Sequence, residues 1–283
     1  MSKARIPRKT KQIVQQIPRR SSRHLSNKSA KASTHLSQKP LVSVIIPVCN
    51  EANTLGKVIQ EALRVHPRTE VIVIENGSTD GSKLIAKQAG AKVVSYDQRF
   101  GHDVGRTVGA REAKGDILLF VDADFVIPAA EMSPLIEAIQ RGVDVALNKY
   151  IGAIATTDVH RVVVAKYALN AILNRSDLKG TSMTTIPHAM SRNALNVIGA
   201  EHLAVPPLAQ AIAIQRGLRV QAVKYIQVGS RNRVRYSVDE GDPVGDLIVG
   251  DHLEAVHWVI GKTDVRALHE DKLRIREMIE VNR

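Results

Sequence analysis

The sequence predicts an α/β protein with an open, mainly parallel sheet flanked by helices. Two observations support this fold class. Short runs of aliphatic and β-branched residues recur along the chain, and segments with the apolar spacing of a helix separate them. Each run is apolar at consecutive positions, as in strands that are covered on both faces. Strands that alternate with helices in this way pair in parallel through right-handed crossovers.

The first forty residues differ in composition from the rest. Residues 1–40 hold eleven Lys and Arg side chains and no acidic one, and the chain of 283 residues has a net charge of +12. A basic segment with so few large apolar residues is expected to be a disordered arm. A solubilising role and attachment to an anionic membrane surface both remain open. Nucleic-acid binding is disfavoured because aromatic residues, which stack on bases, make up only 3% of the chain.

Residues 41–283 are expected to form one folded domain, with a nucleotide-binding half at 41–125 and an acceptor half at 126–283. Its charges are nearly balanced, and its apolar content is sufficient for a core. The single cysteine, Cys49, cannot form an internal disulfide, and no apolar run reaches the length of a membrane span. The predicted location is the cytoplasm, either free or peripheral at the inner face of the cell membrane.

The elements follow from the apolar patterns in order along the chain. In the first half we expect strands at 41–48, 70–74, 92–96 and 116–121, with helices at 51–65, around Leu84 to Ala89, and at 103–114. In the second half we expect extended segments near 143–148, 184–189 and 218–228, with helices at 159–173, 207–216, 244–260 and 264–279. Helices and strands therefore alternate less regularly after residue 125.

Polar clusters follow three of the first-half strands directly. They are Cys49-Asn50-Glu51, Glu75-Asn76-Gly77-Ser78 and Asp122-Ala123-Asp124. Because ligands of open α/β sheets bind beyond the carboxyl ends of the strands, these clusters are expected to share one site. Two carboxylates at positions i and i+2 after a buried strand suit Mg²⁺ or Mn²⁺, which takes its other ligands from water and phosphate. A solvated turn would also explain two acids at a strand end.

Three segments together resemble the nucleotide-sugar half of family 2 glycosyltransferases, which have the GT-A fold. They are SVIIPVCNE at 43–51, VIVIENGSTDGS at 71–82 and GAREAKGDILLFVDAD at 109–124. The resemblance implies an inverting enzyme that takes a sugar from a nucleoside diphosphate and uses a divalent cation. It also implies an acceptor, such as a polyprenyl phosphate, a cell-envelope glycan or a small molecule.

The resemblance assigns roles to residues of the first half. Pro47, Val48 and Glu51 would line the nucleoside pocket. Glu75 stands where the family usually has an Asp that contacts the base, although capping of the next turn would also explain it. Asp122 would face the ribose and the metal, and Asp124 would be the principal metal ligand and a catalytic residue.

A segment with two glycines, Arg99 to Arg106, lies between the second and third motifs and includes the start of the helix expected at 103–114. Arg106 would contact the diphosphate or form a surface ion pair. Asp103, just before that helix, is expected to be its N-cap.

The resemblance is weaker in the second half, where many relatives carry Glu-Asp at the start of a helix as the catalytic base. Here Val205-Pro206 occupies that place. One explanation is that the acceptor is an ionised phosphate, held by Arg192, which needs no base. Another is that Glu201, Asp251 or His202 acts as the base. A third is that the chain binds a nucleotide sugar without turnover.

Two further groups in the second half are candidate ligands. His252 or His188 would complete the metal shell, although a structural role is the commoner use of a single histidine. Arg231, Arg233 and Arg235 alternate along the chain and would lie on one side of an extended segment. The sequence thus favours a metal-dependent glycosyltransferase, with a non-catalytic nucleotide-sugar-binding scaffold and a nucleotidyltransferase as the alternatives.

Overall fold

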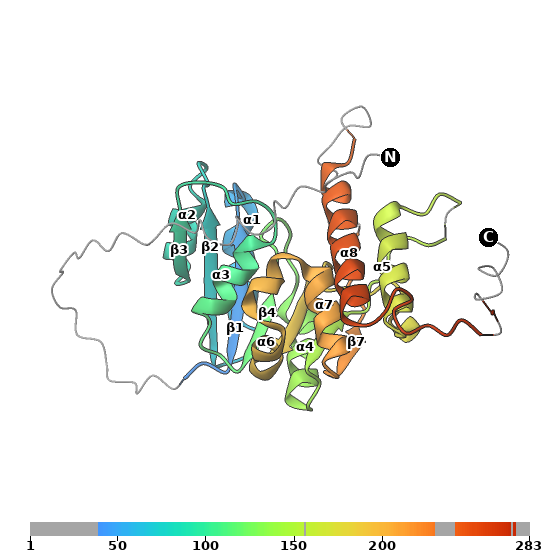
Figure 1. Cartoon of the computed structure of the whole chain (residues 1–283). Coiled ribbons are helices and arrows are strands. Elements are labelled where there is room, and N and C mark those ends of the chain that lie inside the picture. Colours follow the sequence, from blue (N-terminus) through green and yellow to red (C-terminus); the bar gives the residue numbers. More distant parts are fainter. Residues whose placement is uncertain (1–38, 156, 230–240, 273, 276–283) are drawn as a thin grey trace. The chain divides into compact units, whose positions relative to one another are not determined.

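The computed structural model describes residues 39–155, 157–229, 241–272 and 274–275 (Figure 1). The predicted basic arm at 1–40 lies outside the described residues except for its last two. The three arginines at 231, 233 and 235 lie outside them as well. No helix among the described residues is long and apolar enough to cross a membrane.

The described residues form a seven-stranded sheet in the order β3-β2-β1-β4-β6-β5-β7. The strands are β1 (Val42–Val48), β2 (Thr69–Asn76), β3 (Lys92–Tyr96), β4 (Ile117–Phe120), β5 (Val145–Asn148), β6 (His188–Ser191) and β7 (Val220–Lys224). All neighbouring pairs are parallel except those of β6, which runs antiparallel to β4 and to β5. The amino end of β6 therefore lies at the edge where β4 ends, with His188 opposite Phe120.

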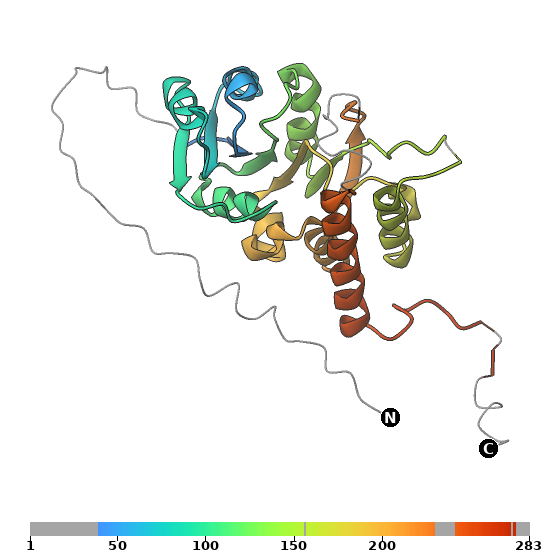
Figure 2. The same ribbon diagram turned by 90° about the horizontal axis from the view of Figure 1, so that it is seen from above.

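Helices cover both faces of the sheet. They are α1 (Ala52–Leu63), α2 (Ser82–Gln88), α3 (Val104–Glu112), α4 (Ala129–Gln140), α5 (Arg161–Ile172), α6 (Arg192–Ile198), α7 (Pro206–Gln215) and α8 (Pro243–Lys262). Figure 2 shows α1, α2 and α4 on one face of the sheet and α3, α6 and α7 on the other. The helix α8 packs beside α5 and α7 through a second apolar cluster that includes Leu169, Ile212 and Val259.

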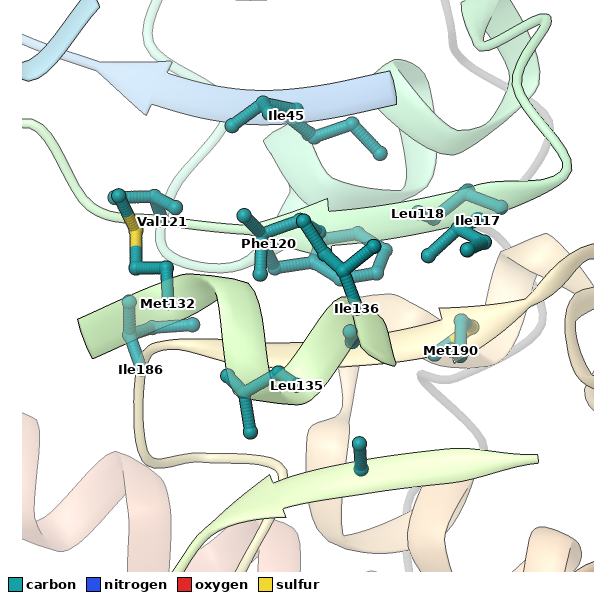
Figure 3. Packing of buried hydrophobic residues seen from close by; sticks show 14 of the residues in the cluster. Ile45, Ile117, Leu118, Phe120, Val121, Met132, Leu135, Ile136, Ile186 and Met190 are labelled. Carbon is teal, nitrogen blue, oxygen red and sulfur yellow. The ribbon is translucent and has the colours of Figure 1, made fainter. Parts of the chain in front are cut away.

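The main core lies between the sheet and its helices. The central strands are buried along almost their whole length, as their apolar sequences predict. Figure 3 shows Ile136 of α4 beside Phe120 of β4, and Met132 of the same helix beside Val121. On the other face, α3 approaches β1 so closely that a Cβ at Gly109 would lie 2.3 Å from Cγ2 of Ile45. Only glycine fits at this position without movement of Ile45.

The predicted fold class is confirmed, but some elements differ from expectation. Two helices, α4 and α6, were not expected; the prolines at 128 and 134 obscured the helical pattern of α4. The extended segment expected at 184–189 becomes a strand only from His188, because Thr185 closes a turn on Ser182. The helix expected at 264–279 is absent from the described residues 264–272, where Ala267 and Leu268 have left-handed backbone angles that end any helix.

Candidate active site

The carboxyl ends of β1, β2 and β4 meet at one edge of the sheet. Val48 at the end of β1 pairs with Glu75 near the end of β2. On the other side of β1, the backbone N–H of Val121 donates to the carbonyl of Ile45, so the chain from Val121 to Asp124 leaves the sheet beside the end of β1. Glu75 and Asp122 therefore flank the same strand end. The expectation that the three polar clusters gather at one edge agrees with this arrangement.

The loops after β1 and β2 are joined by hydrogen bonds. Asn50 has a left-handed φ of 58°, and its side-chain oxygen accepts from the N–H of Thr79 at 2.8 Å. In the other direction, the N–H of Ala52 donates to Asp80 at 2.8 Å, and the N–H of Glu51 donates to Ser82 at 3.1 Å. These bonds fix Glu51 beside the loop that follows Glu75.

Glu75 is buried, and its carboxylate accepts a hydrogen bond from the N–H of Ser78. The residue therefore does cap the turn after β2, which was the structural alternative for it. The neighbouring Asn76 joins this turn to the segment before α3, because its side chain accepts from Phe100 and donates to Gly101.

The Asp122-Ala123-Asp124 segment is fixed by a hydrogen bond from α1. The hydroxyl of Thr54 donates to the carbonyl of Ala123 at 2.6 Å, and Ala123 itself is buried. The side chain of Asp122 remains 39% exposed, so its carboxylate is accessible to a ligand. Two carboxylates held at a strand end in this way offer the hard oxygen donors that Mg²⁺ and Mn²⁺ prefer, so the donor set fits such an ion.

Arg106 connects Asp122 to a buried ion pair at the start of α3. Its guanidinium lies 2.8 Å from the carboxylate of Asp103 and 3.4 Å from that of Asp122. Both Arg106 and Asp103 are almost fully buried. The side chain of Asp103 does not accept the expected N-cap hydrogen bond from the start of α3, because it contacts Arg106 and His102 instead. The surface ion pair considered for Arg106 is likewise wrong, since the pair is buried.

These contacts determine the charges of the surrounding groups. The hydrogen bond to Asp103 raises the pKa of His102, although burial opposes this effect. Burial would raise the pKa of Asp103, but the charge of Arg106 and the hydrogen bond from His102 outweigh it and lower the pKa. His188 is different, because burial and the charge of Arg106 lower its pKa to about 3. Neutral His188 stacks on Phe120, with ring centroids 4.9 Å apart.

Asp251 on α8 is the candidate base whose pKa is affected by the charges of Asp103 and His102. Burial, together with the negative charges of Asp103 and Glu254, raises its pKa to about 7. A carboxyl group with a pKa near neutrality can accept a proton from a substrate under physiological conditions. Asp251 is half-buried, so its side chain is not fully solvated.

The structure does not bring His252 into a three-residue metal cluster with Asp122 and Asp124. In the described part of the chain, no three His, Cys, Asp or Glu side chains lie close enough together to hold an ion. The ring of His252 instead contacts its own helix, with Nδ1 at 2.7 Å from the carbonyl of Ile248. A cation at this edge would therefore rely on the two aspartates together with water and phosphate oxygens.

Arg192 lies away from this site. The register of β4 with β6 places Ser191 opposite Ile117, at the amino end of β4, whereas Asp122 follows its carboxyl end. The guanidinium of Arg192 donates to the carbonyls of Ala113 and Gly115 at that far end. The expectation that Arg192 holds an acceptor phosphate in this site is therefore corrected, because the residue anchors the turn before β4.

The remaining candidates are Glu201 and His202, in a short 3₁₀ helix at Ala200–Ala204 before α7. Their side chains are partly exposed, and His202 Nε2 lies 3.8 Å from the Glu201 carboxylate. At the start of α7, Val205 and Pro206 occupy the place where an acidic pair was sought. Among the described residues, no hydrogen bond joins Glu201 to Asp103 or Asp122, and no ion-pair partner is shared between them.

Sequence reasoning did not identify Lys166 and Thr185. Lys166 on α5 donates from Nζ to the hydroxyl of Thr185 at 2.9 Å, and burial lowers its pKa to about 8. The available signal was a single lysine in the apolar stretch from Val162 to Ile172. Since lysine is rarely buried without a partner, this pattern did not predict that the side chain points inward.

Comparison with known proteins identifies the family of the chain. The family model described as Glycosyl transferase family 2 matches residues 43–197. Glycosyltransferase AglE of Haloferax volcanii is 36% identical over 112 residues, which are 37% of this chain and 34% of that protein. The undecaprenyl-phosphate 4-deoxy-4-formamido-L-arabinose transferase of Aeromonas hydrophila is 35% identical over 115 residues, 37% of this chain and 35% of that protein. The chain thus spans about a third of the length of these relatives.

Solved structures show the same fold over most of the chain. Glucosyl-3-phosphoglycerate synthase from Mycobacterium tuberculosis in complex with UDP superposes with a TM-score of 0.58 at 20% identity, covering 87% of this chain and 88% of that one. A structure of the same enzyme with Mn²⁺, UDP-glucose and phosphoglyceric acid gives a TM-score of 0.58 at 21% identity, covering 83% and 81%. The expected GT-A fold is confirmed by this likeness.

Proposed function

This chain belongs to glycosyl transferase family 2, and on that premise we propose that it transfers a sugar from a nucleoside diphosphate to an acceptor hydroxyl with the help of a divalent cation. The observation that carries the proposal is the meeting of Glu75, Asp122 and Asp124 at the carboxyl edge of three adjacent strands. This edge is where an open parallel sheet binds a nucleotide.

The donor nucleoside is proposed to bind over the ends of β1 and β2. Pro47, Val48 and Glu51 would line this pocket, and the buried Glu75 would accept hydrogen bonds from the base. One oxygen of Glu75 already accepts from Ser78, which holds the carboxylate in place for such a contact. The loop bonds between Asn50 and Thr79 keep both sides of the pocket fixed.

The diphosphate is proposed to lie beside the Asp122–Asp124 segment. Asp122 and Asp124 would hold a Mg²⁺ or Mn²⁺ ion, which, when bound, neutralises the charge of the leaving diphosphate. Arg106 lies 3.4 Å from Asp122 and keeps its carboxylate oriented toward this edge. Its guanidinium also supplies positive potential to the phosphates, although its direct contacts are with Asp103 and Asp122.

The acceptor hydroxyl is proposed to be deprotonated by Asp251. The absence of an acidic pair at Val205-Pro206 leaves the role to another residue, and the raised pKa of Asp251 suits it. Glu201 is the second candidate base, supported by its position just before α7. Attack by the deprotonated oxygen on the face of the sugar opposite the diphosphate would invert the configuration at the anomeric carbon.

The test is nucleotide release from a panel of nucleoside-diphosphate sugars with Mn²⁺, with and without EDTA. We expect release by the wild type, its loss in EDTA, and its loss in Asp124→Asn. Asp116→Asn is the matched control, because Asp116 adjoins the other end of β4 and its side chain is exposed. Binding of donor without any release, in the presence of acceptor, would favour the scaffold. Preference for a nucleoside triphosphate would favour a nucleotidyltransferase.

A polyprenyl phosphate is the second candidate acceptor, favoured by an apolar groove on α5. The groove has a volume of about 560 Å³ and is lined by Ile154, Val159, Val163, Val164, Tyr167, Ala168, Ala171, Ser176 and Lys179. Its lining would accommodate a hydrocarbon chain. Faster nucleotide release with undecaprenyl phosphate in detergent than with detergent alone would support this acceptor.

A further inference from the structure

Lys166 holds a positive charge in an unusual environment. The lysine extends from α5 toward the segment before β6, where its Nζ donates to the hydroxyl of Thr185 at 2.9 Å. Burial is the one cause of the lowered pKa of this group. Lys166 forms no ion pair with any residue in the described ranges. A desolvated ammonium without a carboxylate is costly unless an anion approaches it.

His252 on α8 lies close enough to Lys166 for the lysine charge to lower its pKa. The side chain is 3% exposed, and its Nδ1 contacts the carbonyl of Ile248, which can only accept. Nδ1 therefore carries the proton and Nε2 is an acceptor. Nε2 is buried and has no hydrogen-bond partner among the residues that the structure describes. A buried acceptor left without a partner is uncommon in folded proteins and calls for a ligand or a water molecule.

These groups border the candidate active site. The backbone of Thr185 contacts His188, and His188 in turn is influenced by the charges of Arg106 and Asp103. Asp251, which precedes His252 on α8, is influenced by the charge of Asp103. The Lys166–Thr185 pair is thus linked to the Asp103–Arg106 pair through His188 and through the adjacent residues Asp251 and His252. A ligand bound at Lys166 would lie beside the helix that carries the proposed base.

The segment that carries Thr185 is held rigidly. Gln210 of α7 accepts from the N–H of Met183 at 2.8 Å and donates to the side chain of Asn170 at 2.7 Å. Asn170, in turn, donates to the carbonyls of Lys179 and Thr181. These buried amides connect α5, α7 and the segment before β6. The hydroxyl of Thr185 is therefore pre-positioned relative to Lys166, as a binding site requires.

We propose that Lys166 and Thr185, together with His252, bind an anionic group of the acceptor, a phosphate or a carboxylate. The ammonium uses one of its three protons on Thr185, so two remain for the anion, and the hydroxyl of Thr185 is then free to donate. Nε2 of His252 accepts from a protonated oxygen of the same ligand. As an account of the acceptor, the inference rests on the proposed function; as a binding site, it is testable without turnover.

The test is direct binding, measured by calorimetry in the presence of UDP and Mn²⁺. Three related compounds form a graded series. Phosphoglyceric acid carries a phosphate and a carboxylate, glyceric acid carries a carboxylate alone, and glycerol carries neither. Inorganic phosphate and undecaprenyl phosphate in detergent distinguish a free anion from a lipid headgroup. We expect at least one anion to bind the wild type, glycerol not to bind, and Lys166→Met to weaken anion binding about 10- to 100-fold.

Variants separate a ligand role from a structural one. Lys166→Met is expected to raise the thermal unfolding temperature of the ligand-free protein, because it removes a buried charge, while it lowers the stabilisation by anion. Lys166→Arg keeps the charge and should retain part of the affinity, and Thr185→Val should lose about fivefold. Lys87→Met on α2, where the lysine is exposed, is the control and should leave binding unchanged.

Equal anion affinity in the wild type and Lys166→Met would overturn the proposal. It would also be overturned if none of the anions bound the wild type. Nucleotide release tests the proposed function separately. If the protein binds anions through Lys166 but releases no nucleotide, the anion subsite stands and the transferase assignment fails. If the protein releases nucleotide and Lys166→Met binds anions as tightly as the wild type, the transferase assignment stands and the subsite fails.

Discussion

The guanidinium of Arg106 lies 2.8 Å from the carboxylate of Asp103, and both side chains are almost completely removed from solvent. The same guanidinium reaches Asp122 at 3.4 Å. The start of α3 is thereby connected to the segment that carries the proposed metal ligands. Stability and ligand binding are therefore expected to depend on one buried cation.

Arg106→Met should lower the free energy of unfolding by about 3–5 kcal/mol, because it leaves the carboxylate of Asp103 buried without its partner. Chemical denaturation measures this change. Adding Asp103→Asn to the variant should restore part of the loss, since the uncompensated charge is then gone. Arg141→Met, which breaks an exposed pair with Glu137, is the control and should change stability by about 0.5 kcal/mol or less. Similar losses in both arginine variants would refute the argument.

Asp251 should give transfer a pH dependence with a midpoint near 7. Its folded-state pKa is about 7, above its ordinary value of 3.8, so the base is ionised only above neutrality. We expect kcat/KM to rise with pH through this range in the wild type and the rise to disappear, with most of the activity, in Asp251→Asn.

The same shift has a consequence for stability. A carboxyl group whose pKa is raised on folding favours the folded state when protonated, so its effect becomes unfavourable as the pH rises from about 4 to about 7. The stability of Asp251→Asn relative to the wild type should therefore increase over that range. A constant difference between the two proteins would show that Asp251 titrates normally. Glu201→Gln, tested in parallel, decides between the two candidate bases: if the pH-dependent rise in kcat/KM disappears in this variant and persists in Asp251→Asn, the base is Glu201.

Thr54→Val should weaken Mn²⁺ affinity about tenfold while leaving the fold intact. The variant removes the hydroxyl that holds the carbonyl of Ala123, between the two proposed ligands, and such supporting contacts usually contribute to metal affinity by this factor or more. Calorimetric titration of Mn²⁺ in the presence of UDP measures the change. Thr69→Val is the matched control. The hydroxyl of Thr69, the first residue of β2, also donates to a backbone carbonyl, that of His66. Unchanged affinity in Thr54→Val would mean that the segment holds its shape without α1.

Gly109→Ala should destabilise the protein by about 1–3 kcal/mol, because the new methyl group would overlap Ile45 in the closely packed contact of α3 with β1. Thermal or chemical unfolding measures the cost. Gly250→Ala is the opposite control, since its Cβ meets nothing within 4 Å on the exposed side of α8. That variant should gain up to about 1 kcal/mol from the better helix propensity of alanine. A neutral Gly109→Ala would indicate that α3 moves freely on the sheet.

The arrangement of residues 41–125 was predictable because its signals are local. A buried strand followed at once by polar residues is visible at Asp122 and Glu75 without any knowledge of the fold, and parallel pairing brings the strand ends together. The acceptor half gave fewer such signals. Arg192 was placed in the site from its sequence context, but the direction of β6, which sends Arg192 to the far end of β4, depends on pairing between distant strands.

The electrostatic contacts were also beyond sequence reasoning. Asp103 stands at an N-cap position, yet its left-handed backbone turns the side chain inward to Arg106. Lys166 and His252 are 86 positions apart in the chain, and only tertiary packing brings them close enough for the lysine charge to lower the pKa of the histidine. Periodicity identifies which face of a helix is apolar, but it does not reveal which polar groups meet across two helices.

The antiparallel direction of β6 separates the residues proposed for the donor from those proposed for the acceptor. In the proposed function the loops after β1, β2 and β4 would bind the donor, while the segment before β6, together with α5 and α8, would border the acceptor. Substitutions at Lys166, Thr185 or His252 would therefore alter which molecule receives the sugar without disturbing how the nucleotide is held. A scaffold organised in this manner allows descendants of one ancestor to keep a single donor while they diverge toward different recipients.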